Sequence, residues 1–101
     1  LSLGDYHTAV ITEDGSLYIW GSNGEGQLGN GTTTNSSIPQ KIMDNVASVS
    51  LGAEHSAAIT KDGSLYTWGY NGYGQLGNGT TTKSTKPIKI MDNVAELLEN
   101  T

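Results

Sequence analysis

An internal repeat constrains the fold of this 101-residue chain more than any other feature of its sequence. When the chain is shifted by 48 positions, residues 1–47 align with residues 49–95, and 34 of the 47 pairs are identical while 13 differ. So regular a period indicates one structural unit present twice. We therefore divide the chain into a first unit, 1–48, which begins part-way through the motif, and a second, 49–101, whose C-terminal end diverges.

Each unit has the pattern of short β-strands joined by turns. Asp14-Gly15 and Asp62-Gly63 separate pairs of β-branched or alternating segments, as tight hairpin turns do. The glycine-rich stretch 21–34 is predicted as a loop, because each Gly disfavours a helix by about 1 kcal/mol. Pro39 is predicted to open an edge strand, where its missing N–H breaks no ladder. The predicted strands around the first unit are 7–12, 16–20, 39–43 and 46–51.

Four short strands in each repeat predict an all-β fold, namely two four-stranded antiparallel blades of a β-propeller. Two blades alone leave unpaired strand edges, and a propeller ring needs at least about four blades. We expect the ring to be completed by oligomerisation or by repeats missing from this sequence. The trailing segment 94–97 is expected to complete a blade of a neighbouring copy.

The residues shared by both copies resemble the regulator-of-chromosome-condensation repeat. The common string is Ser-Leu-Gly-x-x-His, followed by Asp-Gly-Ser-Leu-Tyr-x-Trp-Gly and Gly-Gln-Leu-Gly-Asn-Gly, and it occupies 2–31 and 50–79. The resemblance implies a propeller, typically of seven blades, that serves as a scaffold for protein contacts. Its signature positions here are Gly4, His7, Asp14, Gly15, Trp20, Gly21, Gln27, Gly29, Gly52, His55, Asp62, Gly63, Trp68, Gly69, Gln75 and Gly77.

The two copies differ mainly at positions predicted to lie in loops. In the alignment of the two copies, Tyr6 corresponds to a glutamate of the second copy, Tyr70 to a serine of the first, and Tyr73 to Glu25. Loops of a propeller gather at its rims, and tyrosines often anchor protein interfaces. These four residues are therefore the candidate partner-binding positions, the alternative being unconstrained drift at exposed sites.

The sequence offers little for catalysis, and we expect no enzymatic activity. His7 and His55 are the two side chains whose ordinary pKa lies near neutrality, and Asp5, which could orient the first, is replaced by Ala53 in the second copy. We expect both histidines to make structural hydrogen bonds. The aromatic rings of the strands, Trp20, Trp68, Tyr18 and Tyr66, are expected in the core between blades.

No cofactor or metal is expected. Gly24–Gly29 has the G-x-G-x-x-G spacing, but no helix follows it to face a pyrophosphate, and no Walker lysine is present. The chain has no Cys for thiolate sites, and no loop gathers carboxylates at calcium-ligand spacing.

Charge argues against nucleic acid and membrane as partners. Five Lys and no Arg oppose ten acidic residues, giving a net charge of −5, whereas a nucleic-acid or membrane surface requires a basic patch. No apolar run approaches the roughly 18 residues that cross a bilayer. The cysteine-free, Thr- and Asn-rich composition favours a bacterial protein at the cell surface or secreted over a cytoplasmic one.

Three functions remain open from the sequence. The first is a non-catalytic scaffold for protein–protein interaction, binding a partner through its rim loops. The second is a fragment, or a designed or duplicated blade pair, that self-assembles into a closed ring with no activity of its own. The third, implied by the family resemblance, is a regulator similar to a guanine-nucleotide exchange factor.

Overall fold

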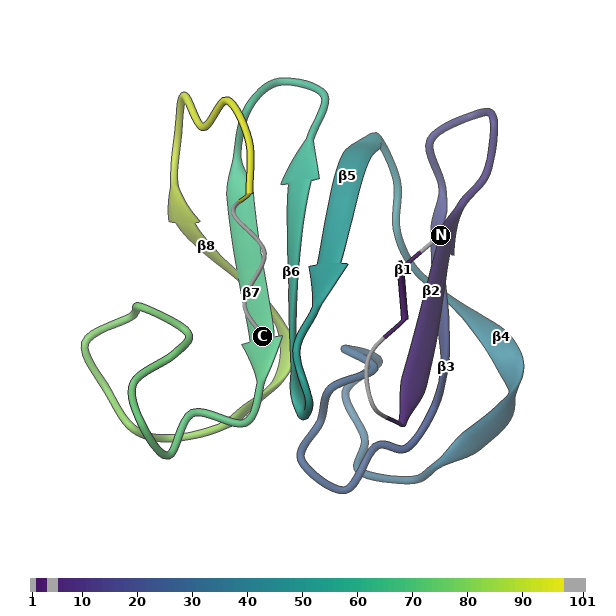
Figure 1. Cartoon of the computed structure of the whole chain (residues 1–101), viewed down its shortest axis with the longest axis vertical. Coiled ribbons are helices and arrows are strands. Elements are labelled where there is room, and N and C mark those ends of the chain that lie inside the picture. Colours follow the sequence, from purple (N-terminus) through teal and green to yellow (C-terminus); the bar gives the residue numbers. More distant parts are fainter. Residues whose placement is uncertain (1, 4–5, 98–101) are drawn as a thin grey trace.

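Two four-stranded antiparallel sheets follow one another along the chain (Figure 1). The computed structural model describes residues 2–3 and 6–97. The first sheet contains β1 (Ser2–Leu3), β2 (His7–Ile11), β3 (Leu17–Gly21) and β4 (Ser36–Met43), in that spatial order. The second contains β5 (Val46–Leu51), β6 (His55–Thr60), β7 (Leu65–Gly69) and β8 (Ser84–Met91). The predicted all-β architecture of two four-stranded sheets is confirmed.

The change of sheet falls at Asp44–Asn45, the turn between β4 and β5. The units 1–48 and 49–101 follow from sequence alignment alone, so β5 spans the boundary between them. A repeat taken from the sequence can start at any point of the period, whereas a sheet ends where the chain stops pairing with its neighbours.

The central hairpins of the two sheets have the same register. His7 pairs with Gly21 in the first sheet, and His55 pairs with Gly69 in the second. Both hairpin turns place a glycine, Gly15 or Gly63, at φ 89°, a left-handed conformation that side chains disfavour. The Asp-Gly turn predicted from the sequence is therefore present in both copies.

The prediction that Pro39 opens a strand is wrong. β4 begins at Ser36, and its pairing with β3 passes from Gln40 directly to Ser36. Pro39 therefore lies in a bulge within the outermost strand of the sheet. At such a position a residue without an N–H removes no ladder hydrogen bond, so the strand continues through the proline.

An apolar core fills the seam between the two sheets. Each sheet with its loops contributes half of the central cluster, and all eight members are at least nine-tenths buried. They are Ala9, Leu17 and Ile19 from strands of the first sheet, Leu28 from the loop that follows β3, and Val46, Leu51, Ala58 and Trp68 from strands of the second sheet. A single sheet cannot bury its own faces, so the packing of one sheet against the other supplies the core that a single blade lacks.

Polar groups also cross the seam, and they converge on one backbone carbonyl. The Gln27 carbonyl accepts the indole N–H of Trp68 at 2.9 Å and the hydroxyl of Ser56 at 2.7 Å. The Ser56 Oγ lies 3.2 Å from His7 Nε2. Because the single hydroxyl proton of Ser56 goes to the carbonyl, His7 Nε2 is the donor to Ser56. A Cβ at Gly29 would lie 2.7 Å from the Trp68 nitrogen, so the indole needs a glycine beneath it.

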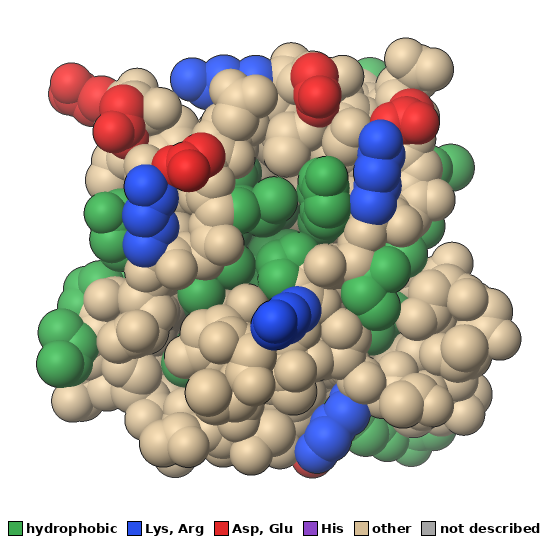
Figure 2. Space-filling model, turned by 180° about the vertical axis from the view of Figure 1, so that it is seen from behind, with side chains coloured by type: hydrophobic (Ala, Val, Ile, Leu, Met, Phe, Trp, Pro, Cys, Tyr) green, Lys and Arg blue, Asp and Glu red, His purple; other side chains and the backbone are tan. Residues whose placement is uncertain are grey.

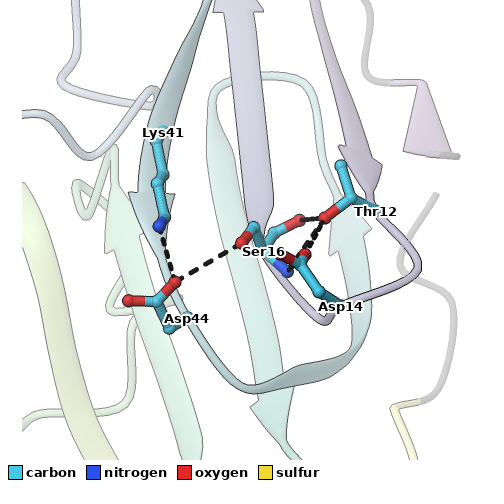
Figure 3. Close-up of polar contacts among 5 residues, drawn as sticks. All are labelled: Thr12, Asp14, Ser16, Lys41 and Asp44. Atoms are coloured by element: carbon cyan, nitrogen blue, oxygen red, sulfur yellow. Dashed lines mark hydrogen bonds and ion pairs between the residues drawn. The ribbon is translucent and has the colours of Figure 1, made fainter.

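The two hairpin turns (12–16 and 60–64) and the turns that follow β4 and β8 (44–45 and 92–93) form one edge of the molecule, here called the turn edge. Side chains close these turns, and Figure 3 shows the contacts of the first copy. Asp14 Oδ1 accepts the Ser16 N–H at 3.2 Å and also the Thr12 hydroxyl. Asp44 Oδ1 accepts from Lys41 Nζ at 2.8 Å and from the Ser16 hydroxyl at 3.4 Å.

The second copy repeats this network. Asp62 accepts from the Thr60 hydroxyl and from the Ser64 N–H at 3.3 Å. Asp92 accepts from Lys89 Nζ at 2.7 Å and from the Ser64 hydroxyl at 3.2 Å. These bonds favour the charged carboxylates, so the pKa of each of the four aspartates is lowered. The main cause is the threonine hydroxyl for the pKa of Asp14 and Asp62 and the lysine for Asp44 and Asp92.

Seen from behind, the molecule shows hydrophobic side chains across its middle (Figure 2). Contacts between basic and acidic side chains lie above this band, toward the turn edge. Ile38 and Met91, both on outer strands, are more than half exposed. The outer strands therefore keep apolar surface at the solvent.

We expect acid to destabilise the protein through the turn edge. A carboxylate whose pKa is lowered on folding below its ordinary 3.8 stabilises the fold above that value, and this contribution is lost as the pH falls through the lowered pKa. The urea midpoint should therefore fall between pH 5 and pH 2. The variant D14N/D62N, which cannot titrate at these two turns, should show a smaller fall. An equal fall in both proteins would contradict this role.

The shared carbonyl of the seam predicts strong coupling between its two donors. Ser56→Ala and Trp68→Phe should each lower the free energy of unfolding by about 1–3 kcal/mol. The double variant should lose more than the sum, because the buried Gln27 carbonyl then keeps neither donor. Urea unfolding of the four proteins measures the coupling. The matched pair Thr8→Ala and Trp20→Phe, measured in dilute solution, should be additive, and a zero coupling for the seam pair would overturn the prediction.

Candidate protein-interaction site

The antiparallel topology places the long loops together at the edge opposite the turns (Figure 1). This loop edge consists of residues 22–35, 52–54 and 70–83, together with Tyr6 at the start of β2. Tyr6 belongs there because its carbonyl accepts the Ser22 N–H at 2.8 Å. All four candidate partner-binding residues of the sequence therefore lie at the loop edge, although they come from separate segments.

A buried asparagine holds each long loop in place. Asn23 donates from Nδ2 to the carbonyls of Thr32 at 2.8 Å and Thr34 at 3.1 Å, while its Oδ1 accepts the Leu28 N–H at 2.9 Å. Asn71 makes the equivalent three bonds in the second copy, at 2.9, 3.0 and 2.9 Å. Both asparagines are fully buried. One side chain thus supplies the polar contacts that a strand or helix would give to the loop backbone.

The sequence analysis missed these asparagines. The available signal was their identity in both copies within a polar loop, where the neighbouring positions 22 and 25 change. Their role depends on carbonyls 9 and 11 residues further along, which no local pattern reveals.

A glutamine fixes the backbone directly beneath the variable position of each loop. Gln27 Oε1 accepts the Glu25 N–H at 2.8 Å, and Gln75 Oε1 accepts the Tyr73 N–H at 2.9 Å. Residue 25 and residue 73 therefore have the same backbone support and different side chains. Residues shared by both copies hold the loop, and the residue that differs is a partly exposed Glu25 in the first copy and an exposed Tyr73 in the second.

Tyr70 and Tyr73 form an aromatic pair on the second loop. Their ring centroids lie 6.0 Å apart with an interplanar angle of 71°, an edge-to-face contact. Tyr73 is 89% exposed, and Tyr70 is partly buried. The pair borders an open pocket of about 240 Å³. Its lining residues are Gly52, Ala53, Glu54, His55, Tyr70, Tyr73 and Gln75.

The other two candidates lie apart from this pair. Tyr6 is 72% exposed and belongs to the segment that enters the first sheet. Glu25 faces the second loop, with Oε1 4.0 Å from Lys83 Nζ, and the same Nζ donates to the Gly24 carbonyl at 3.5 Å. Glu25 therefore links the two loops, a role that the sequence analysis did not foresee.

The two signature histidines occupy different environments. His7 is 2% exposed and bonds to Ser56 across the seam. His55 is half-buried at the open pocket, and burial lowers its pKa below the ordinary value of 6.5. Burial therefore favours the neutral form of the His55 imidazole.

The remaining signature residues are structural in position. Gly21 and Gly69 have positive φ at the ends of β3 and β7. Trp68 is fully buried, whereas Trp20, at the same position of the first copy, is partly exposed. Gly4 lies outside the described residues.

The described residues contain neither a cluster of metal ligands nor a membrane-spanning helix. Across 2–3 and 6–97, no three His, Asp or Glu side chains gather as metal ligands would. Within the same ranges, no helix has the length and apolar character needed to cross a membrane.

Comparison with known families identifies the repeat. The model of the family described as "Regulator of chromosome condensation (RCC1) repeat" matches residues 14–59 and 62–96. A second model of the same repeat matches residues 46–75.

Curated relatives match over one repeat only. The human X-linked retinitis pigmentosa GTPase regulator, the human E3 ubiquitin-protein ligase HERC2 and the ultraviolet-B receptor UVR8 of Arabidopsis thaliana are each 45% identical over 42 residues, which is 42% of this chain. The match covers 4%, 1% and 10% of those proteins respectively. The matched segment is thus at most a tenth of each relative.

Solved structures with the same fold extend the match to both sheets. Human WBSCR16 is 30% identical with a TM-score of 0.79, covering 88% of this chain and 24% of that one. Prp20p of Saccharomyces cerevisiae is 24% identical with a TM-score of 0.78 and the same coverage. The predicted propeller blades are confirmed by these structures. Since the family model also matches most of its residues, the chain belongs to the regulator of chromosome condensation (RCC1) repeat family.

Proposed function

We propose that this chain is a non-catalytic scaffold that binds a protein partner through its loop edge. The observation that carries the proposal is the Tyr70–Tyr73 pair, whose rings are presented to the solvent by a backbone fixed through Asn71 and Gln75. A partly exposed aromatic pair beside a pocket is the kind of anchor on which protein interfaces depend. Because the loop is already ordered, binding costs little additional conformational entropy.

The family supports a regulatory or interaction role without specifying an activity. Three of the relatives are a GTPase regulator, a ubiquitin ligase and an ultraviolet-B receptor. Since one repeat occurs in proteins of such different activity, it contributes a fold on which separate sites are built. Partner choice in this chain is then a property of the residues that differ between its copies.

An exchange-factor-like role is the alternative that the GTPase-regulator relative favours. In this role the chain would regulate another protein, a GTPase, and would contact it through the same loop edge. Nucleotide release from a panel of small GTPases measures it directly, and acceleration by the wild-type chain would favour this role.

We also propose that copies of the chain self-associate toward a closed ring. The proposal is supported by residues that are partly exposed at the two ends of the sheet pair, whereas the equivalent residues of the other copy are buried where the two sheets meet.

We predict that Y70A/Y73A loses its protein partner. Wild-type chain is immobilised, retained proteins are identified by mass spectrometry, and the purified partner is titrated against each variant. The double variant should bind at least tenfold more weakly, because two anchors of roughly 1–2 kcal/mol each are removed. Met91→Ala, an exposed apolar residue at the opposite edge, is the control and should bind as the wild type does. Full affinity in Y70A/Y73A would show that the loop edge is not the binding surface.

A further inference from the structure

The seam between the sheets joins two different faces. The face of the first sheet carries His7, Ala9, Leu17 and Gly29, and it receives Trp68 of the second sheet. We call this the receiving face. The face of the second sheet that packs against it, here called the inserting face, carries Ser56, Ala58 and Trp68. Since the chain is a repeat, each sheet has one face of each kind, and among the described residues one face of each kind is packed at the seam.

The unused receiving face belongs to the second sheet. Its residues are His55, Ala57, Leu65 and Gly77, the equivalents of His7, Ala9, Leu17 and Gly29. The first-sheet residues are buried at the seam, with His7 at 2% and Ala9 and Leu17 at 0% exposure. All four equivalents in the second sheet remain partly or largely exposed.

The unused inserting face belongs to the first sheet. Thr8, Val10 and Trp20 take the places of Ser56, Ala58 and Trp68. The second-sheet residues are all fully buried, and the three equivalents are partly exposed. The chain therefore presents an indole and a hydroxyl at one end.

The groups that would accept hydrogen bonds from this indole and this hydroxyl are present at the other end of the sheet pair. Gln75 stands where Gln27 offers its carbonyl to the indole and the hydroxyl. The space above Gly29 is filled by Trp68, whereas the nearest atom to a Cβ at Gly77 is Ile90 Cγ2 at 3.7 Å. Among the described residues, no side chain fills at Gly77 the place that Trp68 fills at Gly29.

The backbone after β8 leads toward this place. The Val94 N–H donates to the Gly63 carbonyl at 2.8 Å, as the Val46 N–H donates to the Gly15 carbonyl at 2.9 Å where β5 begins. Leu97 then lines an open pocket of about 180 Å³ on the receiving face. The other lining residues are Ser50, Gly52, His55, Ala57, Leu65, Thr67 and Gln75. The path that β5 takes over the first sheet is therefore begun again over the second.

We propose that a second copy of this chain docks head-to-tail on the receiving face, with its Trp20 indole N–H and Thr8 hydroxyl donating to the Gln75 carbonyl. The inference rests on the self-association proposed above and specifies its contacts. A second copy is the occupant because it brings the same chemical groups, in the same relative positions, that already pack at the seam within one chain. Such an interface is heterologous, so each added copy exposes the same two faces until a ring closes.

The head-to-tail geometry is tested with two variants that each damage one face. Trp20→Ala removes the inserting indole, and Ala57→Lys places a charged side chain on the receiving face. Both residues are partly exposed in the single chain. Sedimentation velocity over a range of concentrations measures the mass of each protein. Ile38→Lys, which introduces at an exposed outer position the residue of the second copy, is the control.

The wild type and Ile38→Lys are expected to form assemblies of several chains. Each face variant alone should associate at least about thirtyfold more weakly, because a buried aromatic anchor or an apolar contact is lost. A mixture of the two should form a dimer and no larger species, since one intact inserting face and one intact receiving face remain. This mixture also shows that both variants are folded.

Three results would overturn the inference. Assembly of Trp20→Ala with wild-type affinity would remove Trp20 from the interface while leaving self-association standing. A mixture that stays monomeric would exclude head-to-tail docking. A wild type that is monomeric throughout would end the proposed self-association and this inference together, but it would leave partner binding at the loop edge untouched.

Discussion

The backbone carbonyl of Gln27 is the group on which the packing of the two sheets depends. It accepts the Trp68 indole and the Ser56 hydroxyl from the other sheet, and it belongs to the same residue whose side chain supports Glu25. The seam and the long loop are therefore joined through one glutamine. A change in the loop conformation would displace the Gln27 carbonyl. The indole N–H of Trp68 and the hydroxyl of Ser56 would then be buried without an acceptor. This coupling explains why a chain with so little apolar sequence can hold two sheets together.

The two edges of the molecule use their polar residues differently. At the turn edge, aspartate, serine, threonine and lysine bond to one another, so each turn is closed by its own side chains. At the loop edge, Asn23, Gln27 and Asn71 hold the backbone from buried positions, whereas Tyr6 and Tyr73 are exposed. The proposed recognition surface is thus separate from the side chains that close the hairpins. Ion pairs at the turn edge are exposed and add little stability beyond setting the turn geometry.

Local features of this fold could be predicted from the sequence, and long-range features could not. The Asp-Gly turns and the strands beside them follow from residue preference, and they are present in both sheets. The position of Pro39 was mispredicted because a bulge depends on the register between β3 and β4. Trp20 and Trp68 occupy the same position of the repeat, each between Leu-Tyr-x and Gly, yet one is partly exposed and the other buried. That difference depends on whether another sheet packs against the tryptophan, and the residues next to it in the sequence do not reveal this.

For the candidate site, the sequence located the edge and the variable tyrosines but missed what supports them. Variation between the copies pointed to positions 22, 25, 70 and 73, which all lie in the loops at one edge. It did not reveal that Glu25 is paired with Lys83, because the pair joins loops of different repeats. The support by Asn23 and Asn71 has a further consequence. Since the asparagine and glutamine bond only to backbone atoms and to other fixed residues, a substitution at position 25 or 73 leaves every one of those bonds in place. New specificities can therefore arise at this edge by single replacements, and evolution can diversify the surface of a copied blade without rebuilding the blade beneath it.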